Sequence, residues 1–311
     1  MNDNFQASKK DFESLHPEAI FNSQVTMGKR KQDLGDVPMD GTNAQEEDSD
    51  DDVDMVNVDF EWFDPQPAVD FHGLKNLLRQ LFDNDAQIFD LSALADLILS
   101  QPTLGSTVKT DGNESDPYAF LSVINLQEHK DKPVIQDLTK YIKSKAATNP
   151  SLAPLDELLS QKTIPPIGLI LTERVINMPG QIVPPMYNML LEEMAWAIQD
   201  KEPYSFTHYL IISRGYEEVE SKLDMEEARP QKKSKKGSKE NPHYFFHPED
   251  EVLQRHAMCS GTIEFTHQQD DGHSDSKRAF QELGIRTNGS LILLDGAQFE
   301  PAVKAVGEYL A

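Results

Sequence analysis

The sequence has a single cysteine, Cys259, among its 311 residues. One thiol cannot build a disulfide framework or a four-cysteine metal site, so we expect a reducing compartment. The sequence also lacks any run of 18 uninterrupted apolar residues, and its first residues contain no apolar core of signal-peptide length. We therefore expect neither a membrane-spanning helix nor a secretory signal.

Glycine-rich phosphate loops are absent as well, because neither a P-loop nor a GxGxxG motif occurs. Asp52 and Asp54 have the spacing of a phosphatase nucleophile motif, but acids precede them where that chemistry needs an apolar strand. Glu192 and Glu193 are adjacent in a predicted helix, so they point to different faces and cannot form an acid–base dyad. The sequence predicts no enzyme and no cofactor.

Lys and Arg are missing from residues 32–74, which contain 14 Asp or Glu and carry -14 of the total charge of -24. Like charges at this density repel in any compact form, and they bury too little apolar area to offset the ordering entropy. We expect a disordered acidic tail over residues 1–55 and one folded domain over residues 56–311. The surplus acid favours a basic protein partner and argues against direct nucleic-acid binding.

The acidic run has two interpretations. It acts as a solubiliser, or it is a polyanionic clamp for a basic client, and Ser49 within it has the surroundings of an acidophilic-kinase site. The client-binding residues would be Glu46, Glu47, Asp48, Asp50, Asp51, Asp52 and Asp54.

A basic block at residues 229–239 contains six Lys or Arg and no acid, and we expect an insertion loop around residues 222–242. Two short runs resemble nuclear-import signals: Lys232, Lys233, Lys235 and Lys236, and more weakly Lys29, Arg30 and Lys31. A further hypothesis is that the basic block pairs with the acidic tail until a client displaces it.

The folded part alternates predicted strands and helices. Strands are predicted near residues 56–62, 118–126, 167–175, 204–213, 257–265 and 290–294. Helices are predicted near residues 71–81, 91–98, 134–142, 186–198, 276–283 and 299–310, with Asp90 or Ser92 as a cap. This order predicts an α/β domain with a mixed sheet of roughly five to seven strands and helices on both faces.

The sequence allows two interpretations for each of two sets of side chains. Trp62 and Phe63 are candidates for client contact, with core packing as the alternative role. His243, His247, His256 and Cys259 have a spacing that could surround zinc, but Tyr244 to Phe246 between them favour a strand packed on a sheet.

The order of features resembles the BCCIP/Bcp family of eukaryotic nuclear proteins, and most closely its fungal-type members. The likeness covers residues 53–311 and is carried by Val58 to Asp64, by the helix after Phe71, by Gly168 to Pro179 and by Pro184–Pro185.

The resemblance implies a fold similar to GNAT-type acetyltransferases without their activity. It implies a nuclear chaperone that shuttles to the cytoplasm and escorts a basic large-subunit ribosomal protein (the L-twenty-three, or universal L-fourteen, type) into 60S assembly. It also implies nuclear transport receptors as partners and a role in export of a phosphatidylinositol phosphate kinase. The alternative is an acyltransferase-like enzyme with an undetected coenzyme A site.

Overall fold

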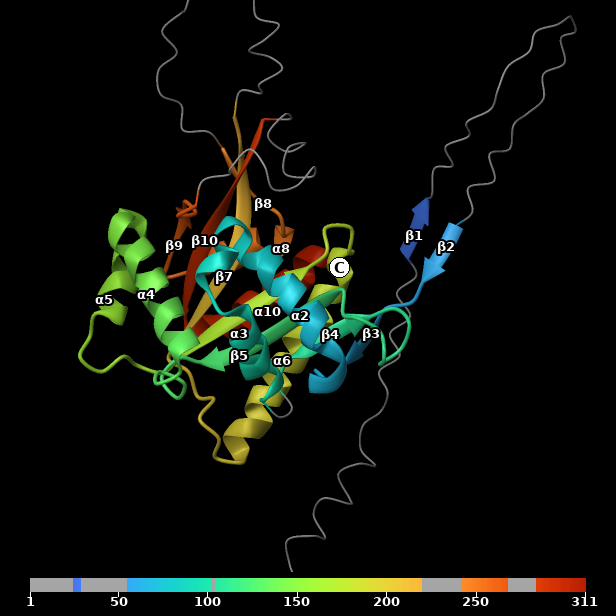
Figure 1. The fold of residues 1–311 in the computed structure, drawn as a ribbon, viewed down its shortest axis with the longest axis horizontal. Helices are drawn as coiled ribbons and strands as arrows, with labels where there is room; N and C mark the ends of the chain where they lie inside the picture. The colour runs from blue at the N-terminus through green and yellow to red at the C-terminus, as the bar shows by residue number, and fades with distance from the viewer. Residues whose placement is uncertain (1–24, 29–54, 102–103, 220–241, 268–283) are drawn as a thin grey trace, which may run out of the picture. The chain divides into compact units, whose positions relative to one another are not determined.

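The computed structural model describes residues 25–28, 55–101, 104–219, 242–267 and 284–311 (Figure 1). The chain divides into two units, Met1–Glu61 and Trp62–Ala311. In the first unit, β1 (Val25–Gly28) and β2 (Met55–Val58) form a two-stranded antiparallel sheet. β1 lies within the segment that the sequence predicts to be disordered, and residues 29–54 lie outside the described ranges.

The second unit is built on an eight-stranded mixed sheet with the order β3-β4-β5-β6-β7-β10-β9, in which β8 also pairs with β7. β6 and β7 are parallel, as their connection through a helix requires, whereas β5 and β10 pair antiparallel with them. The strands are β3 (Glu61–Phe63), β4 (Ser106–Lys109), β5 (Ala119–Asn125), β6 (Ile167–Arg174), β7 (His208–Glu218), β8 (His243–Phe245), β9 (Cys259–Ile263) and β10 (Ile285–Asp295).

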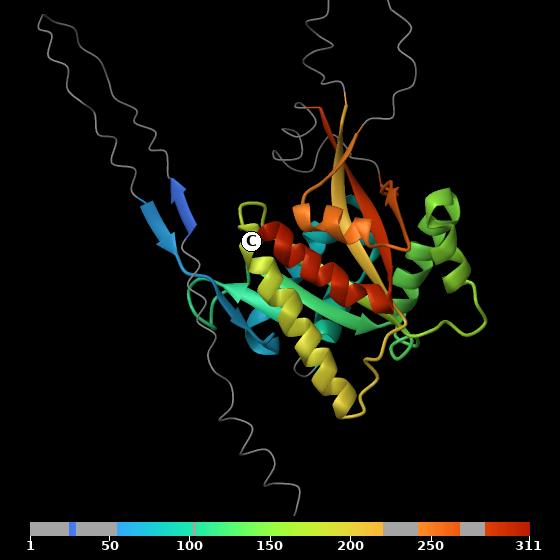
Figure 2. The same ribbon diagram turned by 180° about the vertical axis from the view of Figure 1, so that it is seen from behind.

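Helices cover both faces of this sheet, which confirms the predicted layering (Figures 1 and 2). One face carries α2 (Pro67–Phe82), α3 (Leu91–Leu99), α4 (Pro133–Thr148) and α5 (Ala153–Leu159). The opposite face carries α6 (Val183–Gln199), α8 (Pro248–Arg255) and α10 (Gly296–Leu310). Short 3-10 helices lie at η1 (Asp83–Ile88), η2 (Pro150–Leu152) and η3 (Gly180–Ile182).

Burial on both faces explains the near-continuous apolar runs of the central strands. Leu169 of β6 and Leu210 of β7 pack in one buried cluster with Leu78 of α2. On the other face, the ring of Tyr209 stacks on Phe299 of α10 with 3.9 Å between centroids. None of the helices in the described ranges combines the length and apolar character needed to cross a membrane.

Within the described ranges, the periodic helices and apolar strands agree with the sequence predictions, and the helix predicted near residues 276–283 lies outside those ranges. Three differences concern the strands. β7 and β10 extend beyond their predicted ends because eleven residue pairs hold them together through polar residues such as Asn288. The sheet has one strand more than the predicted maximum because short β4 and β8 form only by pairing with longer neighbours. The strand predicted near residues 56–62 is interrupted, so that β2 and β3 are separate.

The central strands separate at one point, and this separation positions the site described next. The β6–β7 ladder ends at the pair Leu171–Ile212, and β7 pairs with β8 from Gly215 onward. Residues 173–174 and 213–214 therefore lie between two ladders, at the carboxyl end of the parallel pair.

Candidate functional site

The predicted tail and loop sites lie outside the described residues. These are the client-binding acids, the import-signal bases and the phosphosite: Glu46, Glu47, Asp48, Ser49, Asp50, Asp51, Asp52, Asp54, Lys29, Arg30, Lys31, Lys232, Lys233, Lys235 and Lys236. Their roles stay predictions.

Trp62 and Phe63 are half-buried and make contacts within the second unit. The Trp62 indole nitrogen donates a hydrogen bond to the Ile182 carbonyl at 3.3 Å. The Phe63 ring centroid lies 5.5 Å from Lys109 Nζ. These contacts fit the packing alternative for both side chains, and their role in client contact stays a prediction.

The histidines and the cysteine considered for zinc have separate surroundings. His243 lies beside Ser290, His247 pairs with Glu173, and burial raises the pKa of the Cys259 thiol. Within the described ranges, no three His, Cys, Asp or Glu side chains are grouped so that they could hold a metal ion. The strand that was the alternative to zinc is confirmed as β8.

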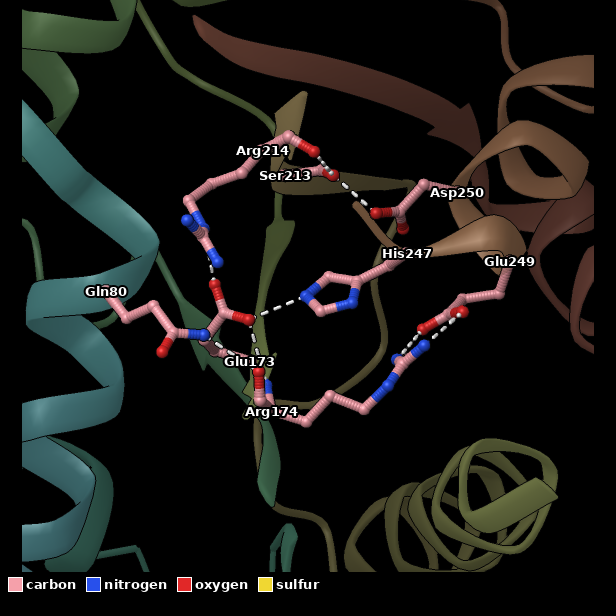
Figure 3. Close-up of polar contacts among 8 residues, drawn as sticks. All are labelled: Gln80, Glu173, Arg174, Ser213, Arg214, His247, Glu249 and Asp250. Atoms are coloured by element: carbon pink, nitrogen blue, oxygen red, sulfur yellow. Dashed lines mark hydrogen bonds and ion pairs between the residues drawn. The ribbon is translucent and has the colours of Figure 1, made fainter. Parts of the chain in front are cut away.

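A buried ionic network fills the space where β6 and β7 separate (Figure 3). Glu173 accepts hydrogen bonds from Arg214 Nε at 2.8 Å and from the backbone nitrogen of Arg174 at 2.9 Å. Its Oε1 also lies 2.6 Å from His247 Nε2. The Glu173 side chain has no exposed surface, so its charge is compensated entirely by these neighbours.

A second part of the network joins the sheet to α8. The Arg174 guanidinium pairs with both carboxylate oxygens of Glu249, and its Nη2 lies 3.0 Å from Oε2. Ser213 Oγ pairs with Asp250 Oδ2, also on α8. Residues far apart in the sequence thus link strands β6 and β7 to one short helix (Figure 3).

The two buried acids of the network have opposite pKa shifts. Burial alone would raise the pKa of Glu173, but the hydrogen bond and charge of His247 and the charge of Arg214 outweigh it and lower the pKa to about 2. Burial and the neighbouring Glu249 charge raise the pKa of Asp250 to about 7. Glu173 is therefore ionised near pH 7, whereas the surroundings of Asp250 favour its protonated form.

The carboxyl ends of parallel strands are the usual ligand position in α/β sheets. Here the charged groups at that position bind one another, and the Arg174, Arg214 and His247 side chains are each at most 7% exposed. Because these buried charges are already paired, the arrangement favours a structural role, in which the network fixes β6, β7 and α8 relative to one another, over substrate binding.

One Ser–His pair has the contact expected of a nucleophile and a base. Ser290 Oγ lies 3.2 Å from His243 Nε2, and this approach requires Gly215, where an added Cβ would lie 2.2 Å from His243 Cε1. His243 Nδ1 has no hydrogen-bond partner within the described residues, so no carboxylate orients the ring. Ser290 is also 3% exposed, which separates it from solvent-borne substrates.

Sequence reasoning missed the ionic network because its members come from β6, β7 and α8, which are remote in sequence. One signal was present. Glu173 and Arg174 continue the apolar run that begins at Ile167, and a charged pair at the end of a buried strand needs partners of opposite charge.

Comparison with known proteins shows that the chain belongs to the BCCIP family, whose family model matches residues 55–253. The protein bcp1 of Aspergillus fumigatus is 72% identical over 91% of this chain and 99% of its own length. The protein bcp1 of Schizosaccharomyces pombe is 53% identical over 83% of this chain and 91% of its own. The crystal structure of BCP1 from Saccharomyces cerevisiae matches with a TM-score of 0.56 and 29% identity, over 86% of this chain and 97% of that one. The likeness to GNAT-type acetyltransferases stays a prediction.

Proposed function

We propose that this protein is a non-enzymatic nuclear escort for a basic large-subunit ribosomal protein of the L-twenty-three, or universal L-fourteen, type. The observation that carries the proposal is the concentration of 14 Asp or Glu, with no Lys or Arg, in residues 32–74. A polyanionic segment attracts a basic client over long range and speeds encounter, while a folded surface supplies specificity.

The interior of the folded unit is consistent with a binding protein. Its buried charged groups between β6 and β7 pair with one another, and the Ser290–His243 contact has no orienting acid among the described residues. We propose in addition that the protein shuttles between nucleus and cytoplasm with transport receptors, through its basic runs, and serves as an adaptor for export of a phosphatidylinositol phosphate kinase.

The role of the acidic run is tested by neutralising it in the full-length chain. In the test variant, Asn or Gln replaces Glu46, Glu47, Asp48, Asp50, Asp51, Asp52 and Asp54. The matched control carries residues 46–54 in permuted order, which keeps charge and composition. The measurement is calorimetric titration with the purified ribosomal protein at low salt and at high salt.

We expect the neutralised variant to bind at least about tenfold more weakly at low salt, and the permuted control to bind as the wild type does. The difference should shrink at high salt, because salt screens the tail. Equal binding by all three chains would assign the acidic run to solubility alone.

A further inference from the structure

Four side chains form a continuous row on one face of the β7–β8 strand pair, beyond the buried network. Alternate residues of a strand share a face, as Arg214 and Tyr216 do on β7. Tyr244 of β8 is paired with Tyr216, and Phe246 follows directly after β8 (Figure 1). The ring centroid of Tyr216 lies 5.4 Å from that of Tyr244 and 5.1 Å from that of Phe246. The Arg214 guanidinium carbon lies 4.8 Å from the Phe246 centroid, so the row runs from Arg214 to Tyr244 without a break.

The two ends of this row differ in exposure. At the inner end, Arg214 is buried over Phe246, and its Nε donates a hydrogen bond to Glu173 at 2.8 Å (Figure 3). At the outer end, Tyr244 is 41% exposed. Among the described residues, only Tyr216 stacks on the Tyr244 ring, and β8 pairs with no strand other than β7. The exposed area of Tyr244 therefore lies on the side of the ring away from Tyr216.

The backbone beneath the rings is held on both sides of β7. On one side β7 pairs with β10 over eleven residues, and on the other Phe246 N donates to the Arg214 carbonyl at 3.2 Å. Gly215 lets β8 pack closely, because an added Cβ there would lie 2.2 Å from His243 Cε1. The rings are thus ordered before any partner arrives, and binding costs little conformational entropy.

Glu218 gives the outer end of the row a negative charge. It is exposed, and it follows Tyr216 by two positions on β7, which places it on the same face. No base in the described ranges pairs with Glu218: Arg214 is compensated within the buried network, and Arg286 of β10 pairs with Glu264. An open aromatic ring beside an unpaired carboxylate is a combination that attracts a cation.

We propose that Tyr216, Tyr244 and Glu218, which we call the Tyr244 surface, bind an arginine side chain of the basic client. The guanidinium stacks on the free side of the Tyr244 ring, as Arg214 lies over Phe246 within the chain, and it pairs with the Glu218 carboxylate. Arginine is favoured over lysine because a planar guanidinium can stack on a ring and still donate hydrogen bonds at its edge. This inference rests on the proposed escort function and locates one client contact on the folded unit.

The first test is calorimetric titration of the full-length chain with the purified ribosomal protein at low and high salt. Tyr244→Leu removes the ring but keeps an apolar side chain, whereas Tyr244→Phe keeps the ring. Tyr309→Leu is the matched control, because Tyr309 is 50% exposed near the end of α10. We expect Tyr244→Leu to weaken binding about fivefold at both salt concentrations, because salt screens a direct contact less than a distant charge. Tyr244→Phe and Tyr309→Leu should each change binding less than about twofold, and thermal unfolding verifies that every variant is folded.

The carboxylate is tested in the same titration. Glu218→Gln should weaken binding about threefold at low salt and less at high salt, because this exposed charge is screened. Glu308→Gln is the control, since Glu308 is an exposed acid on α10.

The preference for arginine is tested with two peptides of equal length, one of arginine and one of lysine. The acidic tail attracts both peptides, so the comparison is between wild type and Tyr244→Leu for each peptide. We expect Tyr244→Leu to weaken binding of the arginine peptide about threefold and to change binding of the lysine peptide less than about twofold. Equal losses for both peptides would overturn the assignment to arginine.

The outcomes separate this inference from the function on which it rests. If the wild-type chain binds the ribosomal protein and Tyr244→Leu binds it equally well, the Tyr244 surface is wrong and the escort function stands. If the wild-type chain does not bind the ribosomal protein at either salt concentration, the escort function fails, and the arginine peptide alone decides whether the surface binds a guanidinium. A wild-type dimer in sedimentation that Tyr244→Leu dissociates would assign the surface to a second copy of the chain and overturn the proposal.

Discussion

Glu173 and Asp250 show how neighbouring buried carboxyl groups acquire opposite protonation states. Glu173 lies against His247 and Arg214, so its ionised form is stabilised. Asp250 is buried beside the negative charge of Glu249, and its hydrogen bond to Ser213 does not offset that repulsion. The consequence is that Asp250, which α8 presents to Ser213, has a raised pKa, whereas Glu173 is ionised at neutral pH.

Removing one charge of the buried Arg174–Glu249 pair should be costly. Glu249→Gln leaves the Arg174 guanidinium buried without its counter-charge, and we expect the free energy of unfolding to fall by about 3 kcal/mol. Glu251→Gln is the control, because Glu251 pairs with Arg255 at the surface and is 54% exposed. Urea unfolding monitored by circular dichroism should show a change of less than about 0.5 kcal/mol for the control. Equal effects of the two substitutions would contradict the structural role of the network.

Glu193 should make stability depend on pH. Burial raises its pKa to about 7, with contributions from Asp64 and Glu192, although Gly105 N donates to it at 2.7 Å. Because the folded-state pKa is raised, protonation of Glu193 stabilises the folded state. This stabilisation is complete below the unfolded pKa of 4.5 and is lost as the pH rises toward 7.

Glu193→Gln cannot ionise and keeps an acceptor for Gly105. Between pH 4.5 and 7 we expect it to gain roughly 2 to 4 kcal/mol in the free energy of unfolding relative to the wild type. Glu192→Gln, at the exposed neighbouring position, should follow the wild-type profile closely. Parallel profiles of Glu193→Gln and wild type in urea unfolding from pH 4.5 to 8 would show that Glu193 is not shifted.

Among the elements, α3 begins at a defined cap. The Asp90 carboxylate accepts hydrogen bonds from the backbone nitrogens of Ser92 and Ala93 at 3.1 and 3.0 Å. Asp90→Ala leaves these donors without their side-chain partner, and we expect a loss of about 1 kcal/mol in the free energy of unfolding. Asp96→Ala, at an exposed position within the same helix, removes an acid without touching a cap and improves helix propensity. A thermal midpoint for Asp90→Ala no lower than that for Asp96→Ala would contradict the capping role.

How well each element was predicted depends on how much of its stability is local. α3 has a cap and an apolar repeat within its own sequence, and β6 has a continuous apolar run, so both were predictable. β4 has only four residues and exists because β5 pairs with it. α8 contains Glu249 and Asp250 at buried positions, where a sequence pattern predicts an exposed face, and only Arg174 and Ser213 explain them. The same non-local pairing hid the ionic network.

At the scale of the whole molecule, the proposed escort function places long-range attraction and binding specificity in different segments. In the proposed function, the acids of residues 32–74 would supply long-range attraction, which acts before contact and weakens with salt. In the same proposal, a surface of the folded unit supplies specificity and acts only at contact. An escort that uses both should capture its client quickly and still hold it in the presence of a competing polyanion.

Competition with ribosomal RNA therefore tests the central claim most directly. The measurement follows fluorescence anisotropy of a labelled rRNA fragment, bound to the basic ribosomal protein, while the full-length chain is added. We predict that the RNA is released completely at about one equivalent of chain, because the escort covers the RNA-binding face of its client. Formation of a stable ternary complex, or no release at a large excess of chain, would contradict the account.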